Sequence, residues 1–230
     1  ESCISNVDCA SLNFEIPVLT HVSIFSTDPT TGIDTVKWSY PKELNTTLYP
    51  GPYHYQLYRQ EGTGGGTETL IYTSTPQASI INPDTTFEDT GLDTENNPYT
   101  YRVELFNDGN LIGGSLNATS IFISLIPNDN ELFIEWEEYV PWNNTSYEIY
   151  RETSPGSTVF NLIGTSNEIG YRDTGLINGN TYCYKIKSIG AYSSDGIVSP
   201  IENWSQEVCG IPVDLTPPCP PVLSIDGDCN

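Results

Sequence analysis

Few side chains in this sequence are of the types that carry out catalysis. Nucleophilic catalysis needs a base beside a Ser, Thr or Cys, and the two histidines, His21 and His54, lie in strand-like segments with no motif around them. Glu135 and Glu137 share one face of a strand-like segment at about 7 Å, a spacing known from glycoside hydrolysis. That face is opposite the apolar face of Trp136, which indicates a solvated surface. We therefore predict that this segment is not an enzyme.

Six cysteines favour disulfides over a metal site. No cysteine occurs from residue 10 to residue 182, and the spacing of the six, without nearby histidine, is a poor zinc pattern. Six cysteines allow 15 connectivities. Proximity along the chain favours three pairs, Cys3 with Cys9, Cys183 with Cys209, and Cys219 with Cys229. Disulfides persist in oxidising compartments, so we expect an extracellular protein, at the cell surface or secreted.

Aspartate and asparagine cluster in several short segments, which raises calcium binding as an alternative. Calcium takes six to eight oxygen ligands, and no twelve-residue loop with a terminal bidentate Glu is present. Turn formation explains Asp, Asn and Gly together without a metal. We expect no cofactor, and calcium at a junction between modules stays the alternative.

The charge balance excludes some partners. Thirty acidic and eight basic residues give a net charge of −22, which repels phosphate backbones and anionic membrane surfaces. No run of 18 apolar residues occurs, so we expect no nucleic-acid binding and no membrane insertion by this segment. The Pro-rich stretch from Thr216 to Pro221 is typical of a linker, and we expect the chain to be part of a longer protein.

One segment of the sequence is repeated. Phe-Glu-Asp-Thr-Gly-Leu begins at Phe87 and Tyr-Arg-Asp-Thr-Gly-Leu begins at Tyr171, each followed by a Tyr-x-Tyr run. The offset of 84 residues favours two modules. Each half contains seven short segments with the period-two alternation of strands, separated by turn signals. We predict an all-β chain of two tandem seven-stranded immunoglobulin-like β-sandwiches.

The predicted strands are as follows. In the first half they are 19–25, 35–40, 53–59, 68–73, 85–89, 99–106 and 111–118, and in the second half 119–125, 132–137, 147–151, 160–165, 168–173, 181–189 and 205–211. Each second strand carries a tryptophan on its apolar face, so we expect Trp38 and Trp136 in the two cores.

The segment from Leu176 to Ile186 resembles the fibronectin type III signature, a Leu, then a Gly-Asn-Thr turn, then a Tyr that opens the sixth strand. The resemblance implies that Tyr182 and, by position, Tyr99 form the tyrosine corners, although Asn-Asn-Pro replaces Gly-Asn-Thr before Tyr99. It covers about residues 14 to 212. The implied divisions are 1–13, the end of a preceding module or a linker; 14–118, module 1; 119–212, module 2; and 213–230, a linker and the start of a following module.

A narrower resemblance rests on the Tyr-x-Ile-Tyr-Arg strand at Tyr147, on the Asp-Thr-Gly-Leu turn, on Tyr182-Cys183-Tyr184-Lys185, and on the segment from Ser205 to Cys219. These features are similar to modules of large secreted surface proteins of gliding Bacteroidota, many of which are exported by the type IX system. In this pattern Tyr184 faces the core and Cys183 points outward, so Cys209 on the adjacent final strand can bridge to it.

Four aromatic residues fall in predicted loops and are candidate partner-binding residues, because aromatic anchors carry much of protein and sugar recognition. They are Tyr139, Trp142, Tyr192 and Trp204. Packing within a module or against its neighbour is the alternative for each of them.

The leading hypothesis for function is a non-catalytic spacer with adhesion or protein-docking surfaces in a larger secreted cell-surface protein. Its expected partners are other proteins or surface glycans, together with neighbouring modules of the same chain. The alternatives are accessory modules of a secreted polysaccharide-degrading or proteolytic enzyme, and a fragment of a receptor ectodomain. Since the linker near Asn117 to Ser120 is short, we expect limited hinge freedom between the modules.

Overall fold

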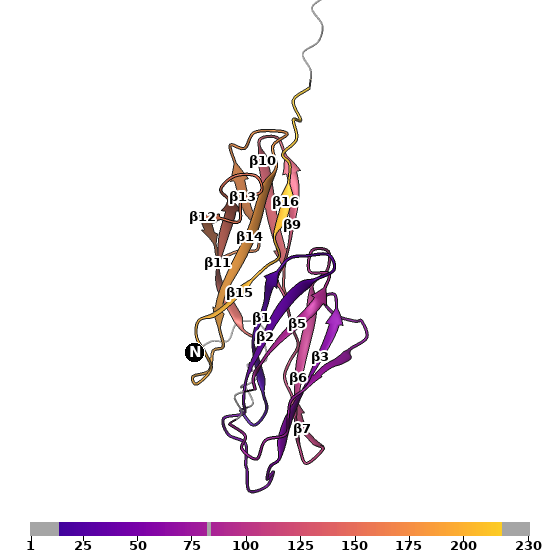
Figure 1. The fold of residues 1–230 in the computed structure, drawn as a ribbon. Helices are drawn as coiled ribbons and strands as arrows, with labels where there is room; N and C mark the ends of the chain where they lie inside the picture. Colours follow the sequence, from indigo (N-terminus) through magenta and orange to yellow (C-terminus); the bar gives the residue numbers. More distant parts are fainter. Residues whose placement is uncertain (1–13, 82–83, 218–230) are drawn as a thin grey trace, which may run out of the picture.

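The computed structural model describes residues 14–81 and 84–217. All regular structure in these residues is β, and it forms two sandwiches that follow each other along the chain (Figure 1). No helix of a length and hydropathy suited to crossing a membrane occurs in the described ranges. The predictions for Cys3, Cys9, Cys219 and Cys229 fall outside these ranges.

The first sandwich packs a three-stranded sheet on a five-stranded sheet. The smaller sheet has the order β1 (Val18–Ser26), β2 (Gly32–Ser39), β5 (Thr86–Leu92). The larger sheet has the order β4 (Thr69–Thr73), β3 (Tyr53–Glu61), β6 (Tyr99–Asn107), β7 (Asn110–Gly114), and β8 (Ala118–Thr119) also pairs with β6. All these pairings are antiparallel.

The second sandwich repeats this arrangement. Its smaller sheet has the order β13 (Tyr171–Thr174), β10 (Glu131–Glu137), β9 (Phe122–Asn128). Its larger sheet has the order β12 (Phe160–Ser166), β11 (Asn143–Glu152), β14 (Tyr182–Ala191), β15 (Ile201–Trp204), and β16 (Val208–Gly210) also pairs with β14. The prediction of two tandem immunoglobulin-like sandwiches is confirmed.

Alternating side chains build each core. Along β10, Leu132, Ile134 and Trp136 are buried, while the residues between them face outward, because successive side chains of a strand point to opposite faces. Trp136 packs on Tyr147 with ring centroids 4.8 Å apart. In the first module Trp38 is 3% exposed and packs edge-on against Tyr55. Each tryptophan therefore joins the two sheets of its sandwich.

Both modules have a tyrosine corner. The backbone N–H of Asp93 donates to the hydroxyl of Tyr99 at 3.0 Å, and that of Ile177 donates to the hydroxyl of Tyr182 at 3.0 Å. In the first module the Asn-Asn-Pro turn is held by Asp93, whose carboxylate accepts from the backbone N–H of Asn96. The corner therefore forms with either turn sequence.

The last strand of the second module differs from the sequence-based expectation. It is split into β15 and β16, and Trp204 ends β15 where a loop was expected. Ser205 and Gln206 cause the break, because their side chains take over backbone hydrogen bonds. Ile186 N–H donates to Ser205 Oγ at 2.9 Å, and Gln206 bonds both the N–H and the C=O of Ile123.

Cys183 on β14 and Cys209 on β16 form a disulfide between neighbouring strands. The two cysteines face each other in the strand register. Tyr184 and Ile186 belong to the core cluster of the second module, and Cys183, which alternates with them, does not. Cys183 is 7% exposed, whereas Cys209 is exposed.

Removing this disulfide should destabilise the second module by about 3 kcal/mol, because the bridge closes a loop of 26 residues in the unfolded chain. The double variant Cys183→Ala/Cys209→Ala is compared with the wild type by hydrogen exchange in urea, read separately for each module. Protection of β11 should fall and protection of β3 should not. Equal protection of β11 in both proteins would contradict a stabilising role for the bridge.

Candidate functional site

The two sandwiches share a buried interface. Trp142 and Ile201 belong to the second module, yet they are continuous with the hydrophobic core cluster of the first module, which contains Leu19 and Val22 of β1. Trp142 is 4% exposed and Ile201 is fully buried. The first module therefore completes its core with side chains of its neighbour.

Hydrogen bonds run along the same interface. The N–H of Val22 donates to Asn203 Oδ1 at 3.0 Å, and the N–H of Trp204 donates to Ser23 Oγ at 2.9 Å. Two more bonds flank these: Tyr192 OH donates to Leu19 C=O at 2.7 Å, and Glu207 N–H donates to Thr27 Oγ1 at 2.7 Å. Figure 1 shows the resulting arrangement, with β15 beside β1. The second module thus bonds the backbone of β1 through the side chains of Asn203 and Tyr192, and its own backbone N–H groups bond the side chains of Ser23 and Thr27.

The linker between the modules is also buried. Thr119 and Ser120 are 1% and 0% exposed. Tyr139 N–H donates to Thr119 Oγ1 at 2.6 Å, and Tyr99 N–H donates to Ser120 Oγ at 3.1 Å. Since Tyr139 lies in the second module and Tyr99 in the first, the linker is fixed to both.

The structure separates the four aromatic candidates. Trp142 and Tyr192 pack against each other in the interface, with centroids 6.0 Å apart, so their rings are not presented to an outside partner. For these two residues the structure therefore shows packing against the neighbouring module, the alternative to partner binding, because the loops that carry them lie against β1. Tyr139 is 64% exposed. Trp204 is partly exposed and lines a groove between the modules.

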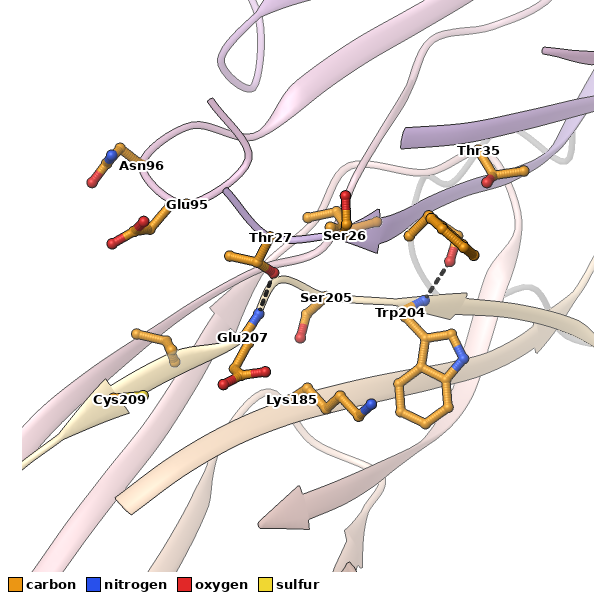
Figure 2. A pocket seen from close by; sticks show the side chains of 14 residues that line it. Ser26, Thr27, Thr35, Glu95, Asn96, Lys185, Trp204, Ser205, Glu207 and Cys209 are labelled. Atoms are coloured by element: carbon orange, nitrogen blue, oxygen red, sulfur yellow. Dashed lines mark hydrogen bonds between the residues drawn. The ribbon is translucent and has the colours of Figure 1, made fainter. Parts of the chain in front are cut away.

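The groove has a volume of about 810 Å³. Strand β1 and the turn at Glu95 and Asn96 form the wall from the first module, and β14 to β16 form the other wall. Figure 2 shows Glu95 and Asn96 on one side and Lys185 and Trp204 on the other. The residues that line the groove are Ser23, Ile24, Phe25, Ser26, Thr27, Thr35, Glu95, Asn96, Lys185, Trp204, Ser205, Glu207, Val208 and Cys209.

The faces of Trp204 are already in contact with other side chains. Lys185 Nζ lies 4.9 Å and Lys187 Nζ 5.7 Å from the ring centroid, and the Tyr150 ring is 5.0 Å away. Lys185 also lies over Phe160, at 4.5 Å. These cation–π contacts hold Lys185 on the wall of the groove.

The Glu207 carboxylate has more repulsion than compensation. Burial and repulsion from Glu152 raise the pKa of Glu207, and Lys185 opposes both effects. Its backbone N–H anchors the module interface, as described above, while Figure 2 shows its side chain between the two walls. The groove therefore holds a carboxylate that a nearby cation would stabilise.

A buried carboxylate pair in the first module was not anticipated from the sequence. Tyr101 OH donates to both Asp34 Oδ2 and Asp89 Oδ2, at 2.9 and 3.0 Å, and Arg59 pairs with Asp89 at 2.8 Å. Among the described residues, Asp34 Oδ1 has no hydrogen-bond partner. Burial raises the pKa of Asp34 to about 7, although the Tyr101 hydrogen bond lowers it. The pair is sealed inside the sandwich and out of reach of a substrate.

Metal-ligating atoms converge at one place in the described residues. The sulfurs of Cys183 and Cys209 and the Glu207 carboxylate lie within 4.8 Å of one another. Because the two sulfurs are bonded to each other, they offer no thiolate.

Of the histidines, His21 is half-buried beside Thr20, and burial lowers its pKa, while His54 stacks on Phe106.

No family model and no curated protein matches the sequence. Among solved structures, the chain is similar to the FN1–FN3 domains of chicken CNTN1, with 11% identity and a TM-score of 0.32, covering 86% of this chain and 66% of that one. It is also similar to a two fibronectin type III domain segment of chicken tenascin, with 17% identity and a TM-score of 0.26, covering 86% and 99%. The assignment to two tandem immunoglobulin-like sandwiches rests on the strand order of the chain itself.

Proposed function

We propose that this pair of modules is a non-catalytic, extracellular spacer that holds a docking surface for adhesion or protein binding within a larger secreted protein. The observation that carries the proposal is the shared interface. A core that continues from one module into the next, four side-chain hydrogen bonds along β1 and a buried linker fix the two sandwiches relative to each other. A rigid pair transmits position and force, and it presents groove residues from both modules in one geometry.

Distance measurements test the rigidity that this function needs. Spin labels on unnatural amino acids at the exposed positions Thr63 and Ser154 report on one module each. Pulsed electron paramagnetic resonance should give a single narrow distance distribution that does not change with temperature below unfolding. A broad distribution like that of two modules on a flexible tether would sink the proposal of a spacer.

The source of the protein belongs to the same proposal. The resemblance at the Tyr147 strand and the Tyr182 to Lys185 segment supports a surface protein of gliding Bacteroidota exported by the type IX system. Peptide mapping of the parent protein from its source, without reduction, reads the flanking chain and the cystines together. Further modules and a C-terminal sorting domain are expected. A catalytic domain or a membrane helix in the flanking chain would replace this proposal by an enzyme accessory module or a receptor ectodomain.

A further inference from the structure

Strand β1 is the outer strand of its sheet, and part of its outer edge is open to the groove. The N–H of Val22 points away from β2, because it donates to Asn203 of the second module. Since alternate residues of a strand direct their N–H and C=O to the same edge, those of Ile24 point into the groove. In the described residues no hydrogen bond joins Ile24 or Phe25 to the second module, although Ser23 and Thr27 on either side are so bonded.

An open strand edge is a template for an added strand. The register of β1 against β2 shifts between Ile24 and Ser26, and the C=O of Ser26 accepts from Thr94 Oγ1, so the open edge is short and centred on Ile24. Ile24 offers one N–H and one C=O to an added strand. Phe25 beside this edge is 72% exposed and lines the groove. The groove thus offers backbone hydrogen bonds and an apolar side chain to the same extended occupant.

A saccharide fits these walls less well. Sugar rings bind by stacking on a free aromatic face, whereas Trp204 already has Lys185, Lys187 and Tyr150 around its ring. The free aromatic ring of the groove is Phe25, which stands beside the strand edge rather than opposite a set of polar groups. Backbone pairing is therefore the favoured mode of recognition.

Charge selects the sequence of the occupant. Glu95 lines the groove from the first module and Glu207 from the second, against one cation, Lys185, whose ammonium is held between the rings of Phe160 and Trp204. Burial and, after it, repulsion from Glu152 raise the pKa of Glu207, and Lys185 opposes both effects. The chain as a whole carries −22, which steers cations toward the surface.

We propose that the groove between the modules binds an extended, lysine- or arginine-containing segment of a partner polypeptide, which pairs as an added strand with β1 and places its cationic side chains at Glu95 and Glu207. The inference rests on the proposed docking function and names its partner class. Lys185 limits the affinity for such a segment.

The probe is a capped hexapeptide of alternating lysine and valine, titrated into the whole chain at physiological salt by calorimetry. Two peptides serve as controls: the same sequence N-methylated at alternate residues, which keeps the charge but cannot pair as a strand, and a glutamate and valine alternation. The unmethylated lysine peptide should bind at least about tenfold more tightly than either control. Equal binding of the methylated peptide would overturn strand pairing, since only non-specific attraction to the acidic surface would remain.

Variants place the binding in the groove. Glu207→Lys should weaken binding of the lysine peptide by about tenfold, and Glu137→Lys, an equal charge change at an exposed position on the other sheet, should leave it nearly unchanged. Lys185→Gln should tighten it, and Phe25→Ser should weaken it. Thermal unfolding of each variant checks the fold. Equal effects of Glu207→Lys and Glu137→Lys, or tighter binding of a neutral oligosaccharide than of the peptide, would refute the proposal.

The two proposals fail in different ways. If the peptide does not bind while the spin-label distance stays narrow, the groove proposal falls and the spacer function stands. If the distance distribution is broad, both proposals fail, because the groove has walls from both modules and needs them in a fixed geometry.

Discussion

Replacing Asp34 by leucine should stabilise the first module by about 3–4 kcal/mol at pH 8 and by clearly less at pH 5. Burial raises the pKa of Asp34 from 3.8 to about 7 in the folded protein. Below pH 4 the carboxyl is protonated in both states and costs nothing by ionisation. Between about pH 4 and 7 the unfolded chain releases the proton and the folded chain keeps it, so stability falls as pH rises. Above pH 7 the penalty stays constant.

The second module indicates that leucine fits this position. Leu132 occupies the place of Asp34, four residues before the core tryptophan, and it is fully buried. There Tyr184 donates to Asp173 at 2.7 Å, and Arg151 pairs with that carboxylate. Tyr101 keeps the equivalent partner, Asp89, when Asp34 is removed.

The control for ionisation is Asp34→Asn, which retains size and polarity. Urea unfolding followed by hydrogen exchange at β6, at pH 5 and pH 8, gives the stability of the first module for the three proteins. Both variants should lose the fall in stability that the wild type shows between the two pH values. If the wild type and Asp34→Asn respond to pH alike, Asp34 is not the group that titrates.

Much of the fold follows from local patterns in the sequence. The alternation of Leu132, Ile134 and Trp136 fixes which face of β10 is buried, and the repeated Asp-Thr-Gly-Leu turn sets the module length, because both are properties of neighbouring residues. The pairing of Cys183 with Cys209 follows from the order of adjacent strands. Asp34 itself was detectable in principle, since it interrupts the apolar face that continues to Val36 and Trp38.

The contact between the modules could not be predicted from local sequence patterns. Val22 and Asn203 are 181 residues apart, and neither differs from an ordinary strand residue until the two sandwiches are placed side by side. Trp142 follows a proline and precedes two asparagines, which is typical of an exposed loop. It is buried only because the neighbouring module covers it. Relative module placement depends on summed surface complementarity, which no short window of sequence contains.

Replacing Trp142 by alanine should therefore uncouple the modules without unfolding the second one. The side chain is 4% exposed, packs on Tyr192 and belongs to the first module's core cluster, so its loss costs about 3–5 kcal/mol. The core of the second module, around Trp136 and Tyr147, is a separate cluster and stays intact. The cost falls on the interface and on the first module.

Tyr139→Ala is the matched control, because Tyr139 lies on the same loop and is 64% exposed. The Trp142→Ala protein should show a broadened distance distribution between labels at Thr63 and Ser154 and faster exchange at β1, whereas Tyr139→Ala should leave both unchanged. Since the groove needs walls from both modules, Trp142→Ala should also weaken binding of the lysine peptide, although Trp142 does not line the groove. A narrow distribution together with lost stability would mean that Trp142 supports a module core and that the hydrogen bonds of β1 alone hold the pair together.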